Sequence, residues 1–301
     1  MIFLGLDGGG SKTRCLIGDG RSILGSGKAG PSNVIRVGEA QTREALNSAI
    51  QQACAEAQVS PSQIYRTCVG LAGAARPEIS SVVQRLLSEI VSGEVEVVGD
   101  TITTLASAFG SGPGVIVIGG TGSIAYGRNA AGQTARVGGW GFAISDEGSG
   151  YWIGRSAVTA AIRNFDETGI SPLLERILKI WSLESLEELV VVANATPPPD
   201  FATLVPLVLA AADAGDACAC SILRLAGTEL ARVAKIAIGR LFPQEPMPQV
   251  AMSGGVFQSS ALVREHFSKN LREEYPDVRI GEILADPVRG ALAMARKRSS
   301  G

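Results

Sequence analysis

The chain has 301 residues, of which 46% are hydrophobic and 19% charged, a composition typical of a soluble protein with a large core. Its formal net charge of -2 and pI of about 5.7 exclude a strong general attraction to nucleic acid or to an anionic membrane. We therefore expect neither of these as a partner.

The opening residues carry no basic leader, and Asp7 interrupts their apolar run, so we expect no secretory signal. No apolar stretch reaches the roughly 18 residues that cross a bilayer. The five cysteines lack disulfide or zinc spacing, which predicts a reducing cytoplasm. His266 is the single histidine, so a catalytic acid or base is expected to be a carboxylate.

The first hundred residues alternate strands with helices. The pattern predicts strands at 1–6, 13–20, 21–30, 66–73 and 95–100, and amphipathic helices at 37–57 and 77–90. The pattern then begins again, because residues 114–129 predict a strand, a Gly/Thr/Ser turn and a returning strand, as at the start of the chain. This repetition indicates duplicated α/β halves, each a mixed sheet covered by helices.

The second half is richer in helix. Helices are predicted at 151–165, 172–181 and 185–194, with a long helical region at 201–242 after a proline-rich break. Residues 248–260 predict a strand that enters a Gly-Gly turn, and residues 286–298 predict a helix rich in small residues.

A glycine-rich turn, DGGGSKT, begins at Asp7. It is not a P-loop, because that motif has glycine directly before Lys-Ser/Thr, whereas Ser11 separates Gly10 from Lys12. The turn also leads into a strand instead of a helix. Periodicity alone therefore favours a plain hairpin turn.

A second turn, GGTGS at residues 119–123, has the same strand context and supports a more specific interpretation. Two such turns facing each other would aim backbone N–H groups at a polyphosphate. Ser11 and Thr121 would add hydroxyl donors, and Asp7 would hold Mg²⁺ through water. A third turn, Gly254-Gly255, would let the backbone lie against a nucleobase or ribose.

Six stretches occur in a specific order: DGGGSKT, VVGD, GGTGS, GGWGFAISDEGSGYWIG, MSGGVF and DPVRGALAMA. This set resembles the sugar-kinase/Hsp70/actin ATPase superfamily and, within it, the BadF/BadG/BcrA/BcrD group, most of all its N-acetylglucosamine kinase and glucosamine kinase members. The resemblance covers nearly the whole chain. The single turns are weak signals, but their order is specific.

The resemblance implies two actin-like (ribonuclease-H-like) α/β domains that close over a central cleft, with ATP, Mg²⁺ and an amino sugar as ligands. It also implies a homodimer. We expect an N-terminal domain at residues 1–106, joined by the C-terminal helix at 287–301, and a C-terminal domain at 107–286.

The resemblance also assigns site residues. The phosphate-binding and adenosine-binding positions are Asp7, Gly9, Gly10, Ser11, Lys12, Thr121, Gly254 and Gly255. The sugar-binding positions are Asn33, Gly122, Ser123, the run 139–143 with Gly139, Trp140 and Gly141, and Asp146. Asp100 takes the place of the catalytic carboxylate. Ile124 stands where animal N-acetylglucosamine kinases carry a sugar-contacting asparagine, which leaves the exact sugar open.

Each of these residues also has a simpler explanation. Asp100 could merely cap the helix that follows it, but it is the one carboxylate at a strand end between the two phosphate turns, where phosphoryl transfer needs a proton acceptor. Asp146 could be a helix N-terminal acid, but the glycines around Trp140 favour sugar contact, with Trp140 as an apolar wall. Asn33 could be only a turn residue. Glu147 could only support the neighbouring residues that contact the sugar.

Three classes of function remain. The leading one is an ATP-dependent kinase acting on the 6-hydroxyl of N-acetylglucosamine, with glucosamine and N-acetylmuramic acid as alternatives. The second is an ATPase activator of a 2-hydroxyacyl-CoA dehydratase or benzoyl-CoA reductase, which would need a cysteine-ligated iron–sulfur cluster; none of the five cysteines lies where such ligands are expected. The third is a non-catalytic ATP-binding regulator or an actin-like structural module.

Overall fold

The computed structural model describes residues 1–74, 76–243, 246–281 and 284–297. The chain divides into two units, the first formed by Met1–Ile116 with Ala285–Gly301 and the second by Val117–Leu284. Each unit is an α/β domain with its own five-stranded sheet, as the sequence predicts.

The sheet of the first unit has the strand order β3-β2-β1-β4-β5. Its strands are β1 (Ile2–Gly8), β2 (Thr13–Gly18), β3 (Ile23–Ala29), β4 (Ile64–Leu71) and β5 (Glu94–Gly99). β2 runs antiparallel to both of its neighbours, β1 and β3, whereas β1, β4 and β5 run parallel to one another. The predicted mixed sheet is therefore confirmed.

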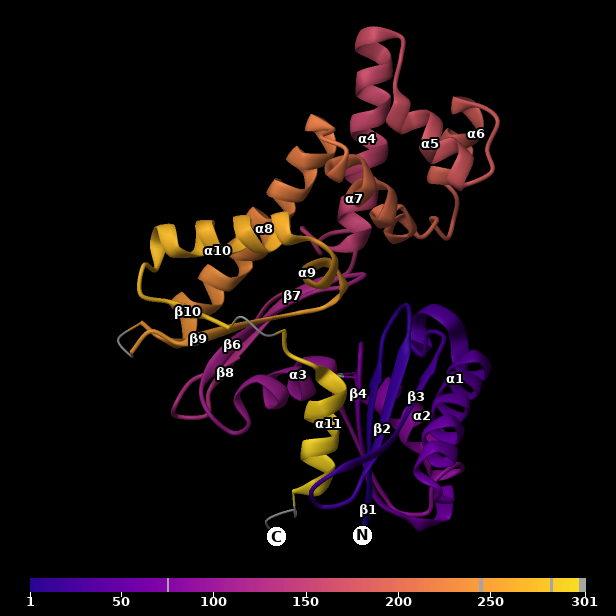
Figure 1. Cartoon of the computed structure of the whole chain (residues 1–301), viewed down its shortest axis with the longest axis vertical. Helices are drawn as coiled ribbons and strands as arrows, with labels where there is room; N and C mark the ends of the chain where they lie inside the picture. Colours follow the sequence, from indigo (N-terminus) through magenta and orange to yellow (C-terminus); the bar gives the residue numbers. More distant parts are fainter. Residues whose placement is uncertain (75, 244–245, 282–283, 298–301) are drawn as a thin grey trace. The chain divides into compact units, whose positions relative to one another are not determined.

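Helices cover both faces of this sheet (Figure 1). They are α1 (Val34–Ala57), α2 (Pro77–Ser88), α3 (Asp100–Phe109) and α11 (Pro287–Arg296), with a short 3₁₀ turn, η1 (Pro61–Gln63). Side chains alternate along β1, so Leu4 and Leu6 pack in the core formed with α1 and α2, while Phe3 packs with α11. Gly5 lies on the α11 face, where an added Cβ would be 2.3 Å from the Leu292 nitrogen. The same alternation places Asp7 on the α11 face.

The sheet of the second unit has the strand order β10-β9-β6-β7-β8. Its strands are β6 (Gly114–Gly119), β7 (Ser123–Arg128), β8 (Thr134–Gly138), β9 (Gln249–Ser253) and β10 (Arg279–Ile280). Read from β8, this order repeats that of the first unit, which supports the predicted duplication. The sequence patterns missed β8, which is short and partly exposed, and β10, which has two residues.

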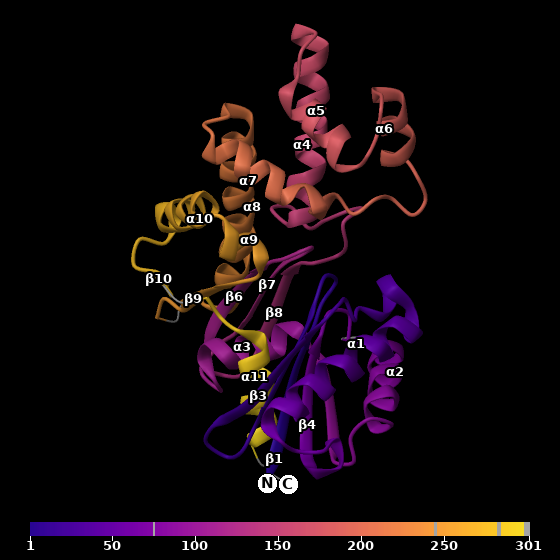
Figure 2. The ribbon, with the colours of Figure 1, turned by 45° about the vertical axis from the view of Figure 1, so that its right-hand side comes forward.

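Helices make up most of the second unit. They are α4 (Gly150–Thr168), α5 (Pro172–Ile180), α6 (Leu186–Ala193), the 3₁₀ turn η2 (Phe201–Leu204), α7 (Val205–Asp213), α8 (Ala217–Leu241), α9 (Gly255–Ser259) and α10 (Ala261–Glu274). In Figures 1 and 2, α8 lies against the sheet, and α10 packs on α8. The predicted helical region at 201–242 is broken at Gly215, whose φ is +85°, and Asp216 then caps α8.

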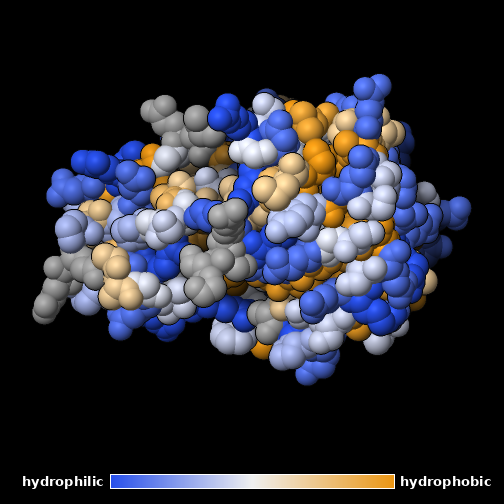
Figure 3. Space-filling model, turned by 90° about the horizontal axis from the view of Figure 1, so that it is seen from below, coloured by the Kyte–Doolittle hydropathy of each residue, from blue (hydrophilic) through white to orange (hydrophobic). Residues whose placement is uncertain are grey.

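Within the described residues, no single helix is both long and apolar enough to cross a membrane. The test is met only jointly, by Phe201–Asp213 and Ala217–Leu241, and these two segments are bent by 118° at the break between them. Hydrophilic and hydrophobic side chains are interspersed on the face drawn in Figure 3.

The domain boundary expected between residues 106 and 107 falls within helix α3. This helix packs so closely on α11 that a Cβ added to Gly290 would lie 1.8 Å from the Thr103 carbonyl oxygen. The Asp286 N–H also donates to the Ser107 hydroxyl at 3.0 Å. These contacts keep α3 in the first unit, and the division falls after Ile116.

Candidate functional site

The first glycine turn is a tight connection between β1 and β2. The Gly9 N–H donates to the Lys12 carbonyl at 3.0 Å, and the Gly9 carbonyl accepts from the Ser32 N–H at 3.2 Å. Gly8 is required here, because an added Cβ would lie 2.4 Å from the Ser32 hydroxyl. Gly10 is half-buried, while Ser11 and Lys12 are exposed. The turn is therefore packed on one side and has its Ser11–Lys12 side toward solvent.

Asp7 lies opposite Arg14 in the β1–β2 pair, and the Arg14 Nη1 is 2.6 Å from Oδ1 of Asp286 at the start of α11. Burial, followed by the charges of Asp100 and Asp286 acting against Arg14, raises the pKa of Asp7 to about 7. A carboxyl with this pKa is about half protonated at neutral pH, and a positive charge that approaches it favours the charged form.

This environment fits a magnesium ion of the kind that binds nucleotides. No group of three or more metal-binding side chains occurs among the described residues, but Mg²⁺ usually takes only one or two carboxylates and keeps water and phosphate ligands. A cation beside Asp7 would offset the repulsion among Asp7, Asp100 and Asp286.

Asp100 is the first residue of α3, not the last of a strand, and β5 before it is a half-buried edge strand. Its Oδ1 accepts from the Thr101 N–H at 2.9 Å, and its carbonyl accepts from the Thr104 hydroxyl at 2.7 Å. Only β4 separates β5 from β1, and Asp7 aligns across Gly70 of β4 with Val98, two residues before Asp100. The helix N-terminus favours the charged carboxylate.

Asn33 is the N-cap of α1, and its side-chain oxygen accepts from the Ile35 N–H at 3.1 Å. The capping explanation for this residue is thus present in the structure. It fixes the position of Asn33 at the segment that also contacts the first glycine turn.

The second glycine turn is joined to the start of α4. The Gly150 N–H donates to the Gly120 carbonyl at 2.8 Å, and the Tyr151 N–H donates to the Thr121 carbonyl at 3.2 Å. The Ser123 hydroxyl donates to the Glu147 carbonyl at 2.7 Å. Ser123 and the residues before α4 therefore form one hydrogen-bonded group, and Glu147 contributes its backbone to it.

Asp146 is the buried acid of this group. It has a positive φ of 69° and is 8% exposed, and its Oδ1 atom has no hydrogen-bond partner in the described part of the chain. Burial raises the pKa of Asp146, against hydrogen bonds from the Ser123 and Gly141 N–H groups that lower it. A buried acceptor without a partner is rare in proteins and indicates a place for a donor from a ligand.

The residues before Asp146 form a loop with exposed apolar side chains. Trp140 is 64% exposed, and Phe142 and Ile144 are exposed as well. Ile124 packs beneath the loop, because a Cβ added to Gly139 would lie 2.8 Å from its Cδ1 atom. Ile124 thus has a packing role here, and Trp140 is open to solvent.

The third turn packs directly on the second. Gly254 has a φ of +98°, and a Cβ added there would lie 2.4 Å from the Gly119 carbonyl oxygen. Gly255, which starts α9, is exposed, and an added Cβ would meet nothing within 4 Å. The backbone at Gly255 is therefore open to a flat ligand.

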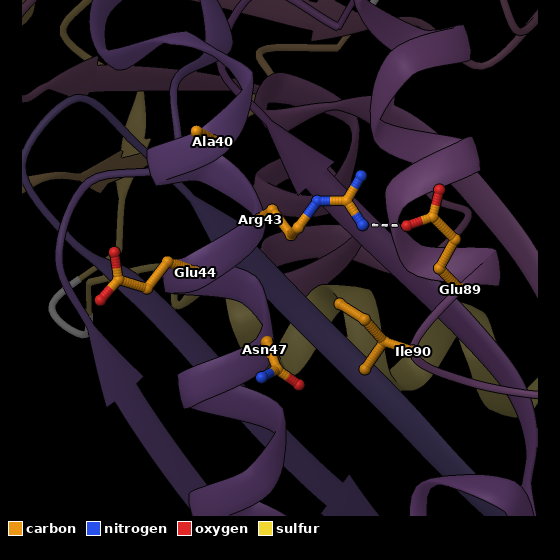
Figure 4. A pocket seen from close by; sticks show the side chains of 6 residues that line it. All are labelled: Ala40, Arg43, Glu44, Asn47, Glu89 and Ile90. Carbon is orange, nitrogen blue, oxygen red and sulfur yellow. Dashed lines mark hydrogen bonds and ion pairs between the residues drawn. The ribbon is translucent and has the colours of Figure 1, made fainter.

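A shallow pocket elsewhere in the first unit, shown in Figure 4, contains none of the predicted site residues. Its lining, on α1 and the end of α2, is Ala40, Arg43, Glu44, Asn47, Glu89 and Ile90. Arg43 and Glu89 form an ion pair across it. We assign this pocket no ligand.

Two α/β units with the same strand order, each with a glycine-rich turn after its first strand, define an actin-like ATPase fold of the kind found in sugar kinases. The chain belongs to the BadF/BadG/BcrA/BcrD ATPase family, whose model matches residues 4–295.

The chain is similar to known proteins along nearly its whole length. The N-acetylmuramic acid/N-acetylglucosamine kinase of Clostridium acetobutylicum is 35% identical over 299 residues, with 97% of each chain covered. The N-acetyl-D-glucosamine kinase of Dictyostelium discoideum is 29% identical, with 98% of this chain and 97% of the relative covered. The crystal structure of a protein provisionally named N-acetylglucosamine kinase, from Chromobacterium violaceum, is 28% identical with a TM-score of 0.78, covering 98% and 99% of the two chains.

Proposed function

We propose that the protein is an ATP-dependent kinase that phosphorylates the 6-hydroxyl of an amino sugar, and that N-acetylglucosamine is its preferred sugar. The observation that carries this proposal is the buried Oδ1 of Asp146, which has no hydrogen-bond partner among the residues that the structure describes. A sugar hydroxyl is a donor that would satisfy this atom. The kinase names of the full-length relatives support the same conclusion.

In this proposal the turns hold the nucleotide. Backbone N–H groups at Gly9 and Gly10 and the hydroxyls of Ser11 and Thr121 bind phosphate oxygens, with Lys12 beside them. Gly254 and Gly255 lie against the adenosine. Asp7 holds Mg²⁺, which supplies positive charge to the phosphates when it is bound.

Asp100 is the proposed catalytic carboxylate. The sugar 6-oxygen attacks the γ-phosphorus, the bond to the bridging oxygen breaks, and ADP leaves. The hydroxyl proton passes late to the Asp100 carboxylate. Its place in the first turn of α3 stabilises the charged form that accepts this proton.

The sugar is assigned to Asp146 and its surroundings. Asp146 accepts from sugar hydroxyls, while Gly122 and Ser123 line its carboxylate and Asn33 contributes its amide. Trp140, flanked by Gly139 and Gly141, offers an apolar wall to the acetamide methyl. Glucosamine and N-acetylmuramic acid are the alternative substrates. Glucosamine differs from N-acetylglucosamine only by its free amine, and N-acetylmuramic acid only by its lactyl ether, so both keep the 6-hydroxyl.

The test is an ADP-release assay with Mg²⁺-ATP across N-acetylglucosamine, N-acetylmuramic acid, glucosamine and glucose. Phosphorus NMR identifies the position of the phosphate in the product. We expect sugar-dependent turnover, highest with an N-acetylated sugar, and a 6-phosphate product. Sugar-independent ATP hydrolysis, or a purified protein containing iron and sulfide, would overturn the proposal and favour the activator class.

A further inference from the structure

Arg136, on β8, contacts the Trp140 loop at three points. Its guanidinium carbon lies 4.3 Å from the centre of the Trp140 ring. Its Nε donates to the Gly138 carbonyl at 3.3 Å, and its Nη2 donates to the Gly139 carbonyl. One exposed side chain therefore holds both the aromatic ring and the backbone that leads to it.

The loop has little stiffness of its own. Gly138, Gly139 and Gly141 have positive φ values of 74°, 70° and 102°, and glycine leaves the backbone many alternatives. Trp140 between them is largely exposed. A ring in this setting keeps one orientation only if something outside the loop holds it.

Arg136 is itself anchored. It pairs with Tyr126 of β7 in the sheet, and its carbonyl accepts from Arg240 of α8 at 3.4 Å. A planar guanidinium can stack on an indole and donate two hydrogen bonds at once, which an ammonium group cannot do. The strand thus presents Arg136 as a rigid support for the loop.

We propose that Arg136 is a positioning residue, which holds Trp140 and the Gly138–Gly139 backbone in the conformation that receives the sugar. This inference rests on the proposed function. The charge of Arg136 also acts on Asp146: burial raises the pKa of that carboxyl, and Arg136 is among the groups that lower it. Arg136 therefore favours both the apolar wall and the charged acceptor of the same sugar site.

The kinetic test compares Arg136→Ala and Arg136→Lys with Arg272→Ala, which removes the same charge from an exposed position on α10. We expect Arg136→Ala to raise the sugar KM about three- to tenfold, while kcat and the ATP KM change less than about twofold. Arg136→Lys should restore only part of the sugar affinity, and Arg272→Ala should match the wild type. An unchanged sugar KM in Arg136→Ala would overturn the proposal. So would a general defect, in which the sugar KM and the ATP KM rise by the same factor and the melting temperature falls.

A second readout does not depend on activity. The chain has three tryptophans, so labelling with 5-fluorotryptophan gives three fluorine NMR signals, and Trp140→Phe identifies one of them. Arg136→Ala should shift and sharpen the Trp140 signal and leave the other two in place. If no sugar is phosphorylated, the proposed function fails, and an unmoved Trp140 signal would then reject the positioning role separately.

The two readouts are linked by a double-mutant cycle. If Arg136 acts through Trp140, Arg136→Ala should raise the sugar KM less than about twofold in a Trp140→Leu background. A full effect in that background would show that Arg136 acts on the sugar without Trp140, and it would overturn the proposal that Arg136 positions this ring.

Discussion

A Cβ atom placed on Gly122 would lie 2.9 Å from the Oδ2 of Asp146. The second glycine turn and the buried carboxylate therefore leave no room between them for even a methyl group. Gly122→Ala should displace the Asp146 carboxylate and raise the sugar KM about tenfold or more, because hydrogen bonds to a charged group are lost.

The control is Gly239→Ala in α8, whose added Cβ would make only an ordinary contact, 3.6 Å from the Tyr275 hydroxyl. Steady-state kinetics of the two variants give the comparison. If Gly122→Ala and Gly239→Ala showed the same sugar KM, this packing would have no part in sugar binding.

Asp100 can be tested by Asp100→Asn, which keeps the size of the side chain but removes the proton acceptor. We expect turnover to fall by about a hundredfold or more with little change in sugar affinity. Single-turnover phosphoryl transfer and calorimetric sugar binding measure the two effects. Near-normal turnover would move the catalytic role to another group.

The raised pKa of Asp7 predicts that the stability of the protein depends on pH. Its pKa in the folded protein is raised from 3.8 to about 7, so the folded state binds this proton more tightly than the unfolded state does. Its contribution to stability is thus greatest below about pH 4 and is lost as the pH rises toward 7. Without nucleotide or Mg²⁺, Asp7→Asn should melt about 4 °C or more above the wild type near pH 8, and this difference should shrink near pH 5.

Thermal unfolding across this pH range, with the exposed Asp277→Asn as the control for loss of one charge, provides the measurement. Parallel melting curves of wild type and Asp7→Asn from about pH 5 to pH 8 would contradict the raised pKa.

Trp140 and Asp146 should affect sugar choice differently. Burying the acetamide methyl contributes on the order of 1 kcal/mol, so N-acetylglucosamine should be preferred to glucosamine about fivefold. Trp140→Ala should erode this preference, whereas Asp146→Ala should weaken every sugar, because all of them carry the hydroxyls. Ratios of kcat/KM for the two sugars test this, and a wild type faster on glucosamine would make glucosamine the better assignment.

The packing of α11 on α3 gives a prediction about stability. Gly290→Ala would place a Cβ 1.8 Å from the Thr103 carbonyl oxygen, so the helices must separate. We expect a loss of about 1–3 kcal/mol, or a fall of several degrees in melting temperature. Gly239→Ala again serves as the control, and equal melting temperatures for the two variants would show that the contact relaxes freely.

Several features follow from local sequence. Apolar alternation and helical periodicity identify most of the strands and helices, because each pattern spans only a few neighbouring residues. The glycine turns are visible for the same reason, since positions such as Gly254 need a conformation that other residues rarely adopt. The repeated strand–turn–strand pattern also predicts the duplicated sheets.

Other features depend on contacts between residues far apart in the chain. The pKa of Asp7 is raised because the fold buries its carboxyl and brings Asp100 and Asp286 close to it, and Arg14 meets Asp286 across 272 positions of sequence. The unpartnered oxygen of Asp146 depends on which donors the fold leaves out of reach. The sequence by itself determined where the glycine turns and candidate acids lie, because these follow from local backbone geometry. Only the tertiary structure decided their burial, charge and partners, because those depend on what the folded chain packs around them.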